Sequence, residues 1–223
     1  LSATPLPNGS ETLTVNPLTA TAIYDAAGNA AAASQSNNTA TLDGTGPTMT
    51  VTAAEGADGF TSNDATLALT FTSSEATTDF AEEDITVTNG ALSDFAATSA
   101  TVYTATFTPT ADGAATIDVA ASTFTDAAGN NNTAASQFNW TYDGTAPTGT
   151  TVSDGTGDDI SYTGSDSSLS AVWPAFTETV SGIAKYEYAI GSTSGGTDVV
   201  DWTDNSTDTS FTKTSLSLSS GTA

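Results

Sequence analysis

An internal repeat is the feature that most constrains the architecture of this chain. The motif Asp43-Gly44-Thr45-Gly46-Pro47-Thr48 returns 100 residues later as Asp143-Gly144-Thr145-Ala146-Pro147-Thr148. A second motif, Asp25-Ala26-Ala27-Gly28-Asn29, returns after 101 residues as Asp126-Ala127-Ala128-Gly129-Asn130. Because the two motifs keep their order and almost keep their register, they indicate a tandem array of similar modules. The Pro of the first motif favours an extended segment and its Gly permits a turn, so we expect it to join consecutive modules.

The interval between the two joints consists of short segments in which apolar and polar residues alternate. Leu67, Leu69 and Phe71 share one face of such a segment. Residues 85–95 carry Asn89-Gly90 between two alternating runs, which predicts a β-hairpin with a type I′ turn. Further strands are expected at residues 49–53, 102–107, 115–119 and 137–142. About seven short strands in a unit of about 100 residues predict an antiparallel β-sandwich of the immunoglobulin type.

We therefore expect an all-β fold made of tandem immunoglobulin-like antiparallel β-sandwiches. Residues 47–146 are expected to form a complete module. Residues 1–46 align with the second half of that module, and we interpret them as the C-terminal part of a preceding one. Residues 147–223 begin a different module and show no final strand pair. Because a sandwich without its last strands leaves sheet edges unpaired, we expect the chain to be a window on a longer array.

Charge and composition exclude several classes of function. The chain of 223 residues carries 26 acidic side chains against two basic ones, a net charge of −24. Binding to nucleic acid or to an anionic membrane surface needs cations that this chain lacks. No run of about 18 apolar residues is present, so we expect no membrane insertion. Without His or Cys, the commonest general base, zinc ligands and thiol nucleophile are missing, and we expect no enzymatic activity.

A series of short motifs crosses the central module in a fixed order. It comprises Phe71-Thr72-Ser73-Ser74-Glu75, Asp84-Ile85-Thr86-Val87-Thr88-Asn89-Gly90, Tyr103-Thr104-Ala105-Thr106-Phe107-Thr108-Pro109, Asp112-Gly113 and Asp126-Ala127-Ala128-Gly129-Asn130. In this order the motifs cover most of residues 49–147, and the module resembles the bacterial Ig-like repeats of giant secreted adhesins and biofilm-associated surface proteins. Residues 149–223 look more like a fibronectin type III repeat, through Trp173, Tyr186-Glu187-Tyr188 and Leu216-Ser217-Leu218-Ser219-Ser220-Gly221-Thr222.

The resemblance implies a structural part in cell adhesion. Repeats of this kind form the stalk or extender region of large extracellular proteins, at the bacterial cell surface or in a biofilm. The partners of each module would be the neighbouring repeats of the same chain, and calcium commonly stiffens the stalk. We therefore expect a structural segment of an extracellular or cell-surface adhesin, whose acidic surface keeps the array soluble.

Carboxylates near the joint between modules are the strongest candidates for a binding site. In a sandwich of this type the B–C and F–G loops lie at the end where the chain enters. The candidate ligands come from the joint, the B–C loop and the F–G loop: Asp43, Glu75, Asp126 and, through a carbonyl, Asn130. Calcium prefers several such hard oxygens, so we predict an inter-repeat calcium site. Asp143 and Glu178 would begin the same site at the next joint.

Three alternative interpretations stay open. Asp-x-x-Gly-Asn is also ordinary turn chemistry, in which Asp accepts hydrogen bonds within its own turn and Gly takes a positive φ. The chain could instead be a subunit of an extracellular filament or sheath, in which strands of one copy complete the sandwich of the next. It could also be an accessory carbohydrate-binding region of a secreted glycoside hydrolase. The aromatic residues for that function would be Trp173, Tyr186, Tyr188 and Trp202, although sandwich packing explains them equally simply.

Overall fold

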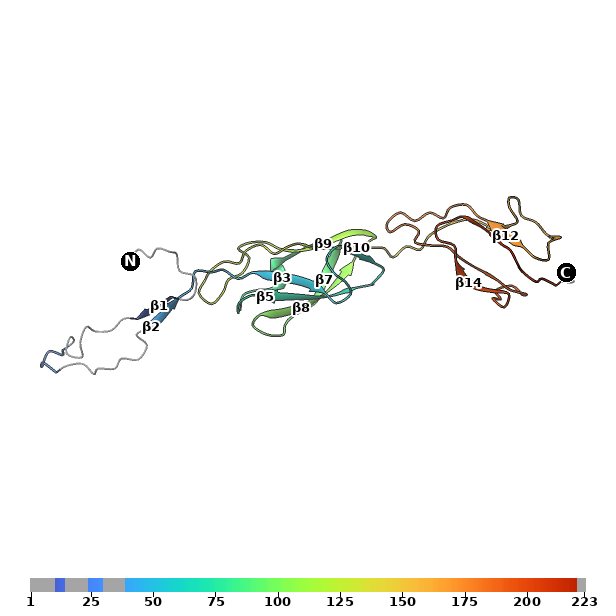
Figure 1. Ribbon diagram of the computed structural model, residues 1–223. Coiled ribbons are helices and arrows are strands. Elements are labelled where there is room, and N and C mark those ends of the chain that lie inside the picture. Colours follow the sequence, from blue (N-terminus) through green and yellow to red (C-terminus); the bar gives the residue numbers. More distant parts are fainter. Residues whose placement is uncertain (1–10, 15–23, 30–38, 220–223) are drawn as a thin grey trace. The chain divides into compact units, whose positions relative to one another are not determined.

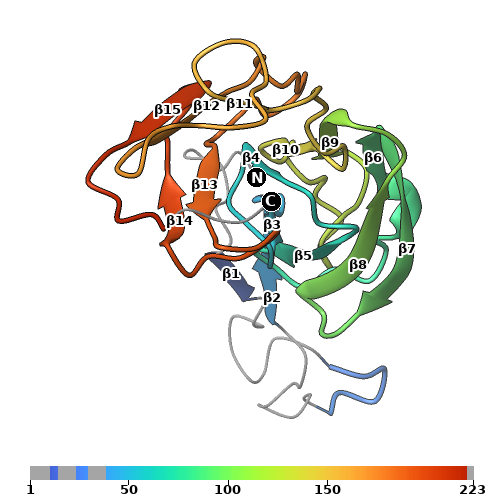
Figure 2. The ribbon, with the colours of Figure 1, turned by 90° about the vertical axis from the view of Figure 1, so that its right-hand side faces the viewer.

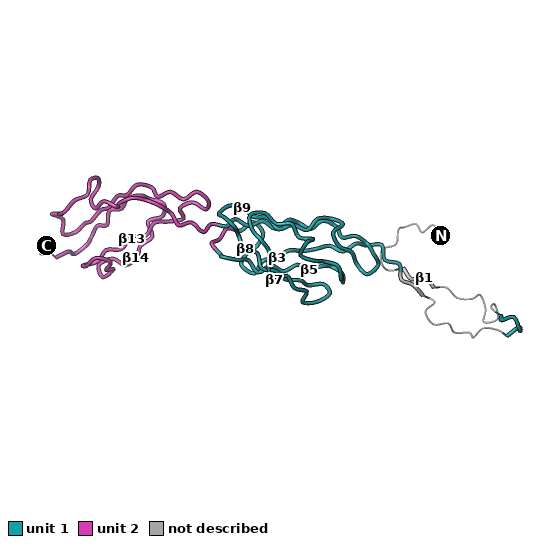
Figure 3. The backbone as a smooth tube through the Cα atoms, turned by 180° about the vertical axis from the view of Figure 1, so that it is seen from behind, with its two compact units in different colours: residues 1–60, 64–142 teal, residues 61–63, 143–223 magenta. Residues whose placement is uncertain are grey.

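The computed structural model describes residues 11–14, 24–29 and 39–219. The chain divides into two compact units, residues 1–60 with 64–142 and residues 61–63 with 143–223, coloured teal and magenta in Figure 3. Apart from the short 3₁₀ turn η1 (Glu82–Asp84), the regular structure of the described residues consists of β-strands arranged in five sheets. The expected all-β fold class is therefore confirmed.

Two four-stranded sheets make up the sandwich of the first unit (Figure 1). One has the order β3-β5-β8-β7, with β3 (Met49–Ala53), β5 (Leu67–Ser73), β8 (Val102–Pro109) and β7 (Gly90–Ala97). The other has the order β4-β10-β9-β6, with β4 (Phe60–Ser62), β10 (Phe138–Tyr142), β9 (Gly113–Val119) and β6 (Ile85–Thr88). β4 is a short strand that the sequence pattern did not indicate. Without β4, the two sheets have the strand orders A-B-E-D and G-F-C of an immunoglobulin-like sandwich.

The core of the sandwich follows from the alternation within its strands. Leu67, Leu69 and Phe71 of β5 are at most 1% exposed, and the residues between them point away from the core. Trp140 of β10 is also 1% exposed, and its ring packs edge-on against Phe107 with the ring centroids 6.0 Å apart. Aromatic side chains remove the largest apolar area from water, so they dominate the stability of this core. The alternation predicted for β5 is therefore confirmed.

The hairpin predicted over residues 85–95 is wrong. β6 pairs with β9 and β7 pairs with β8, so the two runs belong to different sheets. Asn89 takes a positive φ of 55°, but Gly90 does not take a positive φ, so the predicted type I′ turn is wrong as well, and the segment carries the chain from one sheet to the other. Asn89 Nδ2 donates to the carbonyl of Ala111 at 2.8 Å, and a Cβ on Gly90 would lie 2.2 Å from Phe107 Cζ. The local signal therefore predicts the positive φ of Asn89 alone, whereas long-range packing decides which strand is the partner.

A two-stranded sheet precedes the sandwich in the first unit. β1 (Glu11–Thr14) pairs antiparallel with β2 (Thr39–Leu42), which places Glu11 opposite Leu42. Between these strands the structure describes residues 24–29, where Gly28 has a φ of 88°. Most of the partial module expected over residues 1–46 lies outside the described residues.

The second unit has two smaller sheets (Figure 2). One contains β11 (Ser153–Asp154), β12 (Leu169–Val172) and β15 (Ser210–Lys213), and the other contains β13 (Glu187–Ile190) and β14 (Val200–Asp204). Tyr188 stacks on Phe211 with the ring centroids 3.9 Å apart. Among the described residues of this unit, Trp173 is the one hydrophobic residue that is buried. The apolar side chains of the second unit are therefore only partly covered.

Candidate metal centre

Three carboxylates of the first unit lie close together. Asp43, Glu75 and Asp126 each offer one oxygen atom, and these three atoms lie within 4.8 Å of one another. Asp43 belongs to the entry segment (residues 43–48), Glu75 to the B–C loop (residues 74–84) and Asp126 to the F–G loop (residues 120–137). In the described part of the chain, this is the one group of three potential metal ligands with such spacing.

Asp126 is held in place by its own turn. Its Oδ1 accepts hydrogen bonds from the backbone amides of Ala128 and Asn130 at 2.8 and 2.9 Å, and Gly129 closes the turn at a φ of 88°. Burial acts to raise the pKa of Asp126, but the hydrogen bonds from Asn130 and the backbone outweigh it and hold the pKa below its ordinary value. Asp126 is therefore ionised near neutral pH, and its motif forms the turn that the sequence allowed.

The first copy of this motif forms the same turn. Asp25 Oδ1 accepts from the amides of Ala27 and Asn29, both at 2.9 Å, and Gly28 takes a positive φ. Hydrogen bonds led by that from the Asn29 side chain lower the pKa of Asp25. The repeated motif therefore encodes a local turn, and among the described residues only its second copy places the aspartate, Asp126, beside two other carboxylates, Asp43 and Glu75.

Asn130 joins the F–G loop to the entry segment. Its Nδ2 donates to Asp126 Oδ2 at 2.9 Å and to the backbone carbonyl of Asp43 at 3.2 Å. Its backbone carbonyl, which the sequence suggested as a ligand, accepts from the Asp126 amide at 3.1 Å. Through these contacts Asn130 positions the two aspartates.

The entry segment lies directly against the F–G loop. Pro47 is completely buried, and its carbonyl accepts a hydrogen bond from Thr133 N at 3.0 Å. A Cβ on Gly46 would lie 2.0 Å from the carbonyl oxygen of Asn131, closer than any side chain permits. Glycine is therefore needed at this position for the backbones to approach each other.

Glu75 is the carboxylate of the cluster whose ionised form is disfavoured by its surroundings. Burial raises the pKa of the Glu75 carboxyl first, and the negative charges of Asp43 and Asp126 raise it further. The structure gives the Glu75 carboxylate no hydrogen-bond donor among the described residues. The two lysines of the chain, Lys185 and Lys213, belong to the second unit, so no basic side chain of the first unit balances these charges.

The second copy of the joint has different surroundings. Pro147 is exposed, in contrast to the buried Pro47. Glu178 accepts hydrogen bonds from its own turn, at 2.8 Å from Val180 N and also from Gly182 N, and these lower its pKa. Asp143 accepts from Thr145 N at 3.3 Å. Asp143 and Glu178 belong to no group of three ligands among the described residues, so the structure does not build a second copy of the cluster from them.

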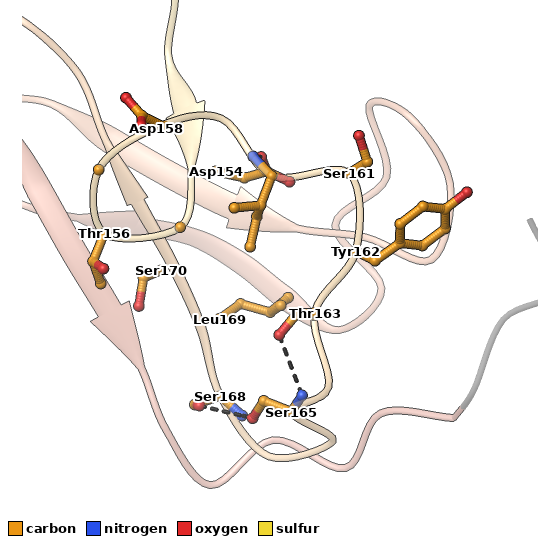
Figure 4. Close-up of a pocket in the computed structure, with 13 residues that line it drawn as sticks. Asp154, Thr156, Asp158, Ser161, Tyr162, Thr163, Ser165, Ser168, Leu169 and Ser170 are labelled. Carbon is orange, nitrogen blue, oxygen red and sulfur yellow. Dashed lines mark hydrogen bonds between the residues drawn. The ribbon is translucent and has the colours of Figure 1, made fainter.

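A separate pocket of about 570 Å³ in the second unit was not indicated by the sequence (Figure 4). Several of its polar side chains form hydrogen bonds within its own wall. Asp154 Oδ1 accepts from Ile160 N at 3.1 Å, and Ser165 N donates to Thr163 Oγ1 at 3.2 Å. These contacts close local turns, and they bring no three carboxylates together.

An aromatic groove of about 410 Å³ lies in the same unit. Trp202 is 65% exposed on its rim, whereas Trp173 in its wall is 7% exposed. The rings of Tyr186, Tyr188 and Phe211 also line it. Trp173 and Tyr186 pack edge-to-face with their centroids 5.4 Å apart. Burial thus distinguishes the buried Trp173 and the partly buried Tyr186, Tyr188 and Phe211 from one accessible tryptophan, Trp202.

Comparison with known families agrees with the fold. Residues 43–142 match the family model of the bacterial Ig-like domain, a range that begins at Asp43 of the cluster and ends with β10. No curated protein matches the chain. Domains of this family are typically non-catalytic and typically occur on extracellular or surface proteins, and residues 43–142 are similar to them. No helix in residues 11–14, 24–29 or 39–219 is long and apolar enough to cross a membrane.

Proposed function

We propose that this chain is a stalk or extender segment of a large bacterial cell-surface or secreted adhesin, stiffened by inter-repeat calcium bound where the chain enters the sandwich of the first unit. The observation that carries the proposal is the convergence of Asp43, Glu75 and Asp126 from three separate segments. An ion held by all three would tie the entry segment to both loops of the sandwich. A bacterial Ig-like domain supplies the structural module on which such a tie would act.

The three carboxylates fit calcium in chemistry and in spacing. Calcium binds hard oxygen ligands at about 2.3–2.6 Å, so two oxygens on one ion lie at most about 5 Å apart. The separation of 4.8 Å or less at this site meets that condition. Magnesium, at about 2.1 Å from its ligands, requires oxygens within about 4.2 Å of each other. An upper limit of 4.8 Å is compatible with calcium, and the all-oxygen ligand set suits that ion.

A bound divalent cation would supply positive charge where the protein has none. Asp126 and Asp43 would hold the ion from the F–G loop and the entry segment, and Glu75 would hold it from the B–C loop. Glu75 has the raised pKa, so its charge gains most from an adjacent cation. Because the entry segment connects this module to the residues before it, the cross-link would restrict motion at the joint.

Thermal unfolding of the whole chain tests this function. We expect the melting temperature of the first unit to rise when millimolar calcium replaces a chelator. Calcium at about 100 times its Kd adds about 2.7 kcal/mol to stability, which for a domain of this size corresponds to a rise on the order of 10 °C. Glu75→Gln should remove most of the rise, because it keeps the shape of the side chain and deletes one charged ligand.

Asp58→Asn is the matched control for Glu75→Gln. Asp58 is an exposed carboxylate that accepts hydrogen bonds from the Asn139 backbone and side chain at 2.7 and 3.0 Å, outside all three segments of the cluster. This variant removes the same charge and should keep the full response to calcium. Identical melting curves in chelator and in calcium for the unaltered chain would contradict the proposed calcium function.

The exposed tryptophan of the aromatic groove favours a second candidate function, carbohydrate binding. Trp202, at 65% exposure, could stack on a sugar ring at the rim of the groove. We expect Trp202→Ala to abolish binding to any glycan that the unaltered chain retains on a glycan array. Tyr162→Ala is the control, since Tyr162 is 82% exposed and lies outside the groove. A chain that retains no glycan would remove this candidate.

A further inference from the structure

A fourth carboxylate, Asp79, joins the two loops of the cluster. Its Oδ1 accepts a hydrogen bond from Thr77 Oγ1 at 2.7 Å within the B–C loop. The Thr125 amide donates to both oxygens, at 3.1 and 3.0 Å, and Thr125 Oγ1 donates to Oδ2 at 2.7 Å. Thr125 directly precedes Asp126 in the F–G loop. One side chain therefore connects the loop of Glu75 to the residue beside Asp126.

The B–C loop end of this connection is anchored in the core. Thr77 is 3% exposed, and its amide donates to the Ala100 carbonyl at 2.9 Å. The hydroxyl of Tyr103, a buried residue of β8, donates to the Thr77 carbonyl at 2.8 Å. Phe80, the residue after Asp79, is 5% exposed in the core. Asp79 thus extends from a fixed point of the sandwich toward the F–G loop.

Asp79 connects the two loops as a clamp and is not one of the three grouped carboxylates. Both of its oxygens accept hydrogen bonds from Thr77 or Thr125. Burial acts to raise its pKa, but the hydrogen bonds from the two threonines outweigh it and lower the pKa. Asp79 therefore remains ionised and able to accept these bonds at neutral pH.

The cluster needs such a clamp when no ion is bound. Asp43, Glu75 and Asp126 repel one another, and the first unit has no lysine or arginine to hold them. Asn130 ties Asp126 to the entry segment, but among the described residues it forms no hydrogen bond with the B–C loop. The contacts of Asp79 with Thr125 connect the B–C loop to the F–G loop immediately beside Asp126.

We propose that Asp79 is a positioning residue that holds Glu75 against Asp126 in the metal-free protein, so that the site is formed before an ion arrives. The clamp consists of contacts that need no metal, and only its effect on affinity rests on the proposed calcium function. A preformed site avoids the cost of ordering two loops at the moment of binding. Residues that orient metal ligands in this way typically change metal affinity by about 10- to 100-fold when they are altered.

Three variants of the full chain test the inference. Asp79→Asn removes the charge that accepts both Thr125 bonds, Thr125→Val removes the hydroxyl donor, and Thr125→Ser keeps it. In calcium-free buffer, we expect amide hydrogen exchange at Thr125, Ala128 and Asn130 to accelerate in the first two variants and to remain slow in Thr125→Ser. In calorimetric titrations with calcium, Asp79→Asn and Thr125→Val should raise Kd by about 10- to 100-fold, although all three ligands are intact.

Asp58→Asn again serves as the control, because it removes one exposed, hydrogen-bonded carboxylate elsewhere in the sandwich. It should leave both the exchange of the F–G loop and the calcium Kd unchanged. Unaltered exchange in Asp79→Asn would overturn the clamp. Faster exchange with an unchanged Kd would overturn the positioning of the ligands. If the unaltered chain bound no calcium, the proposed function would fail, and the exchange rates in calcium-free buffer would still decide whether Asp79 holds the loops.

Discussion

Position 46 is the single residue at which the two joint motifs differ within the Pro-containing turn. Gly46 lies where a Cβ would meet the Asn131 carbonyl at 2.0 Å, whereas Ala146 of the second copy is exposed. Ala146 therefore could not occupy a position equivalent to that of Gly46, because its Cβ would clash with a backbone as close as that of Asn131. This difference agrees with the buried Pro47 and the exposed Pro147.

We expect Gly46→Ala to destabilise the first unit by about 1–3 kcal/mol, because the neighbour of the new methyl group is backbone and cannot move aside cheaply. Chemical denaturation measures this loss directly. Ala146→Gly is the reverse exchange at the exposed copy and should change stability by less than about 0.5 kcal/mol. Equal stability of Gly46→Ala and the unaltered chain would mean that the entry segment is not seated on the F–G loop in solution.

Among the elements, the two predicted turns had different outcomes. Asn89 has the positive φ that the Asn-Gly signal predicts but Gly90 does not, and the pair links β6 of one sheet to β7 of the other. Asp126-Ala127-Ala128-Gly129-Asn130 closes the predicted turn and also contributes a carboxylate to the cluster. Turn chemistry depends on a few adjacent residues, whereas strand pairing and ligand grouping depend on residues tens of positions apart. Local sequence signals therefore indicate that a turn is present, but they do not indicate which strands it connects or which ligands it brings together.

The topology of the sandwich was enough to predict which loops contribute residues to the cluster. Once residues 49–142 are read as an immunoglobulin-like sandwich, the B–C and F–G loops must lie at the end where the chain enters. That rule placed Asp43, Glu75 and Asp126 near one another, and the structure brings their oxygens within 4.8 Å. No comparable rule indicated Asp79, whose role depends on the hydrogen bonds that it makes across the two loops.

In the molecule as a whole, the two units differ in how well they bury apolar side chains. Among the described residues of the first unit, sixteen buried hydrophobic residues form the core cluster. In the described part of the second unit, Trp173 alone reaches that degree of burial, and Val152 and Trp202 are 56% and 65% exposed. Because removal of apolar area from water is the main source of stability, the two units are expected to differ in stability.

We therefore expect two transitions in a calorimetric scan of the chain in chelator, with the second unit unfolding at the lower temperature. Hydrogen exchange followed by mass spectrometry at rising temperature assigns the transitions, because peptides of residues 147–219 should lose protection before those of residues 49–142. A single transition in which both sets of peptides exchange together would contradict this expectation.

The sequence by itself determined the fold class, the strand alternation and the segments from which ligands could come. Alternation sets which side chains face inward, and this information is local. Only the tertiary structure decided that β6 and β7 separate into different sheets, that Pro47 is buried while Pro147 is exposed, and that Asn130 orients the cluster. These outcomes depend on contacts between residues far apart in the chain, which identical short motifs cannot specify because their neighbours in space differ.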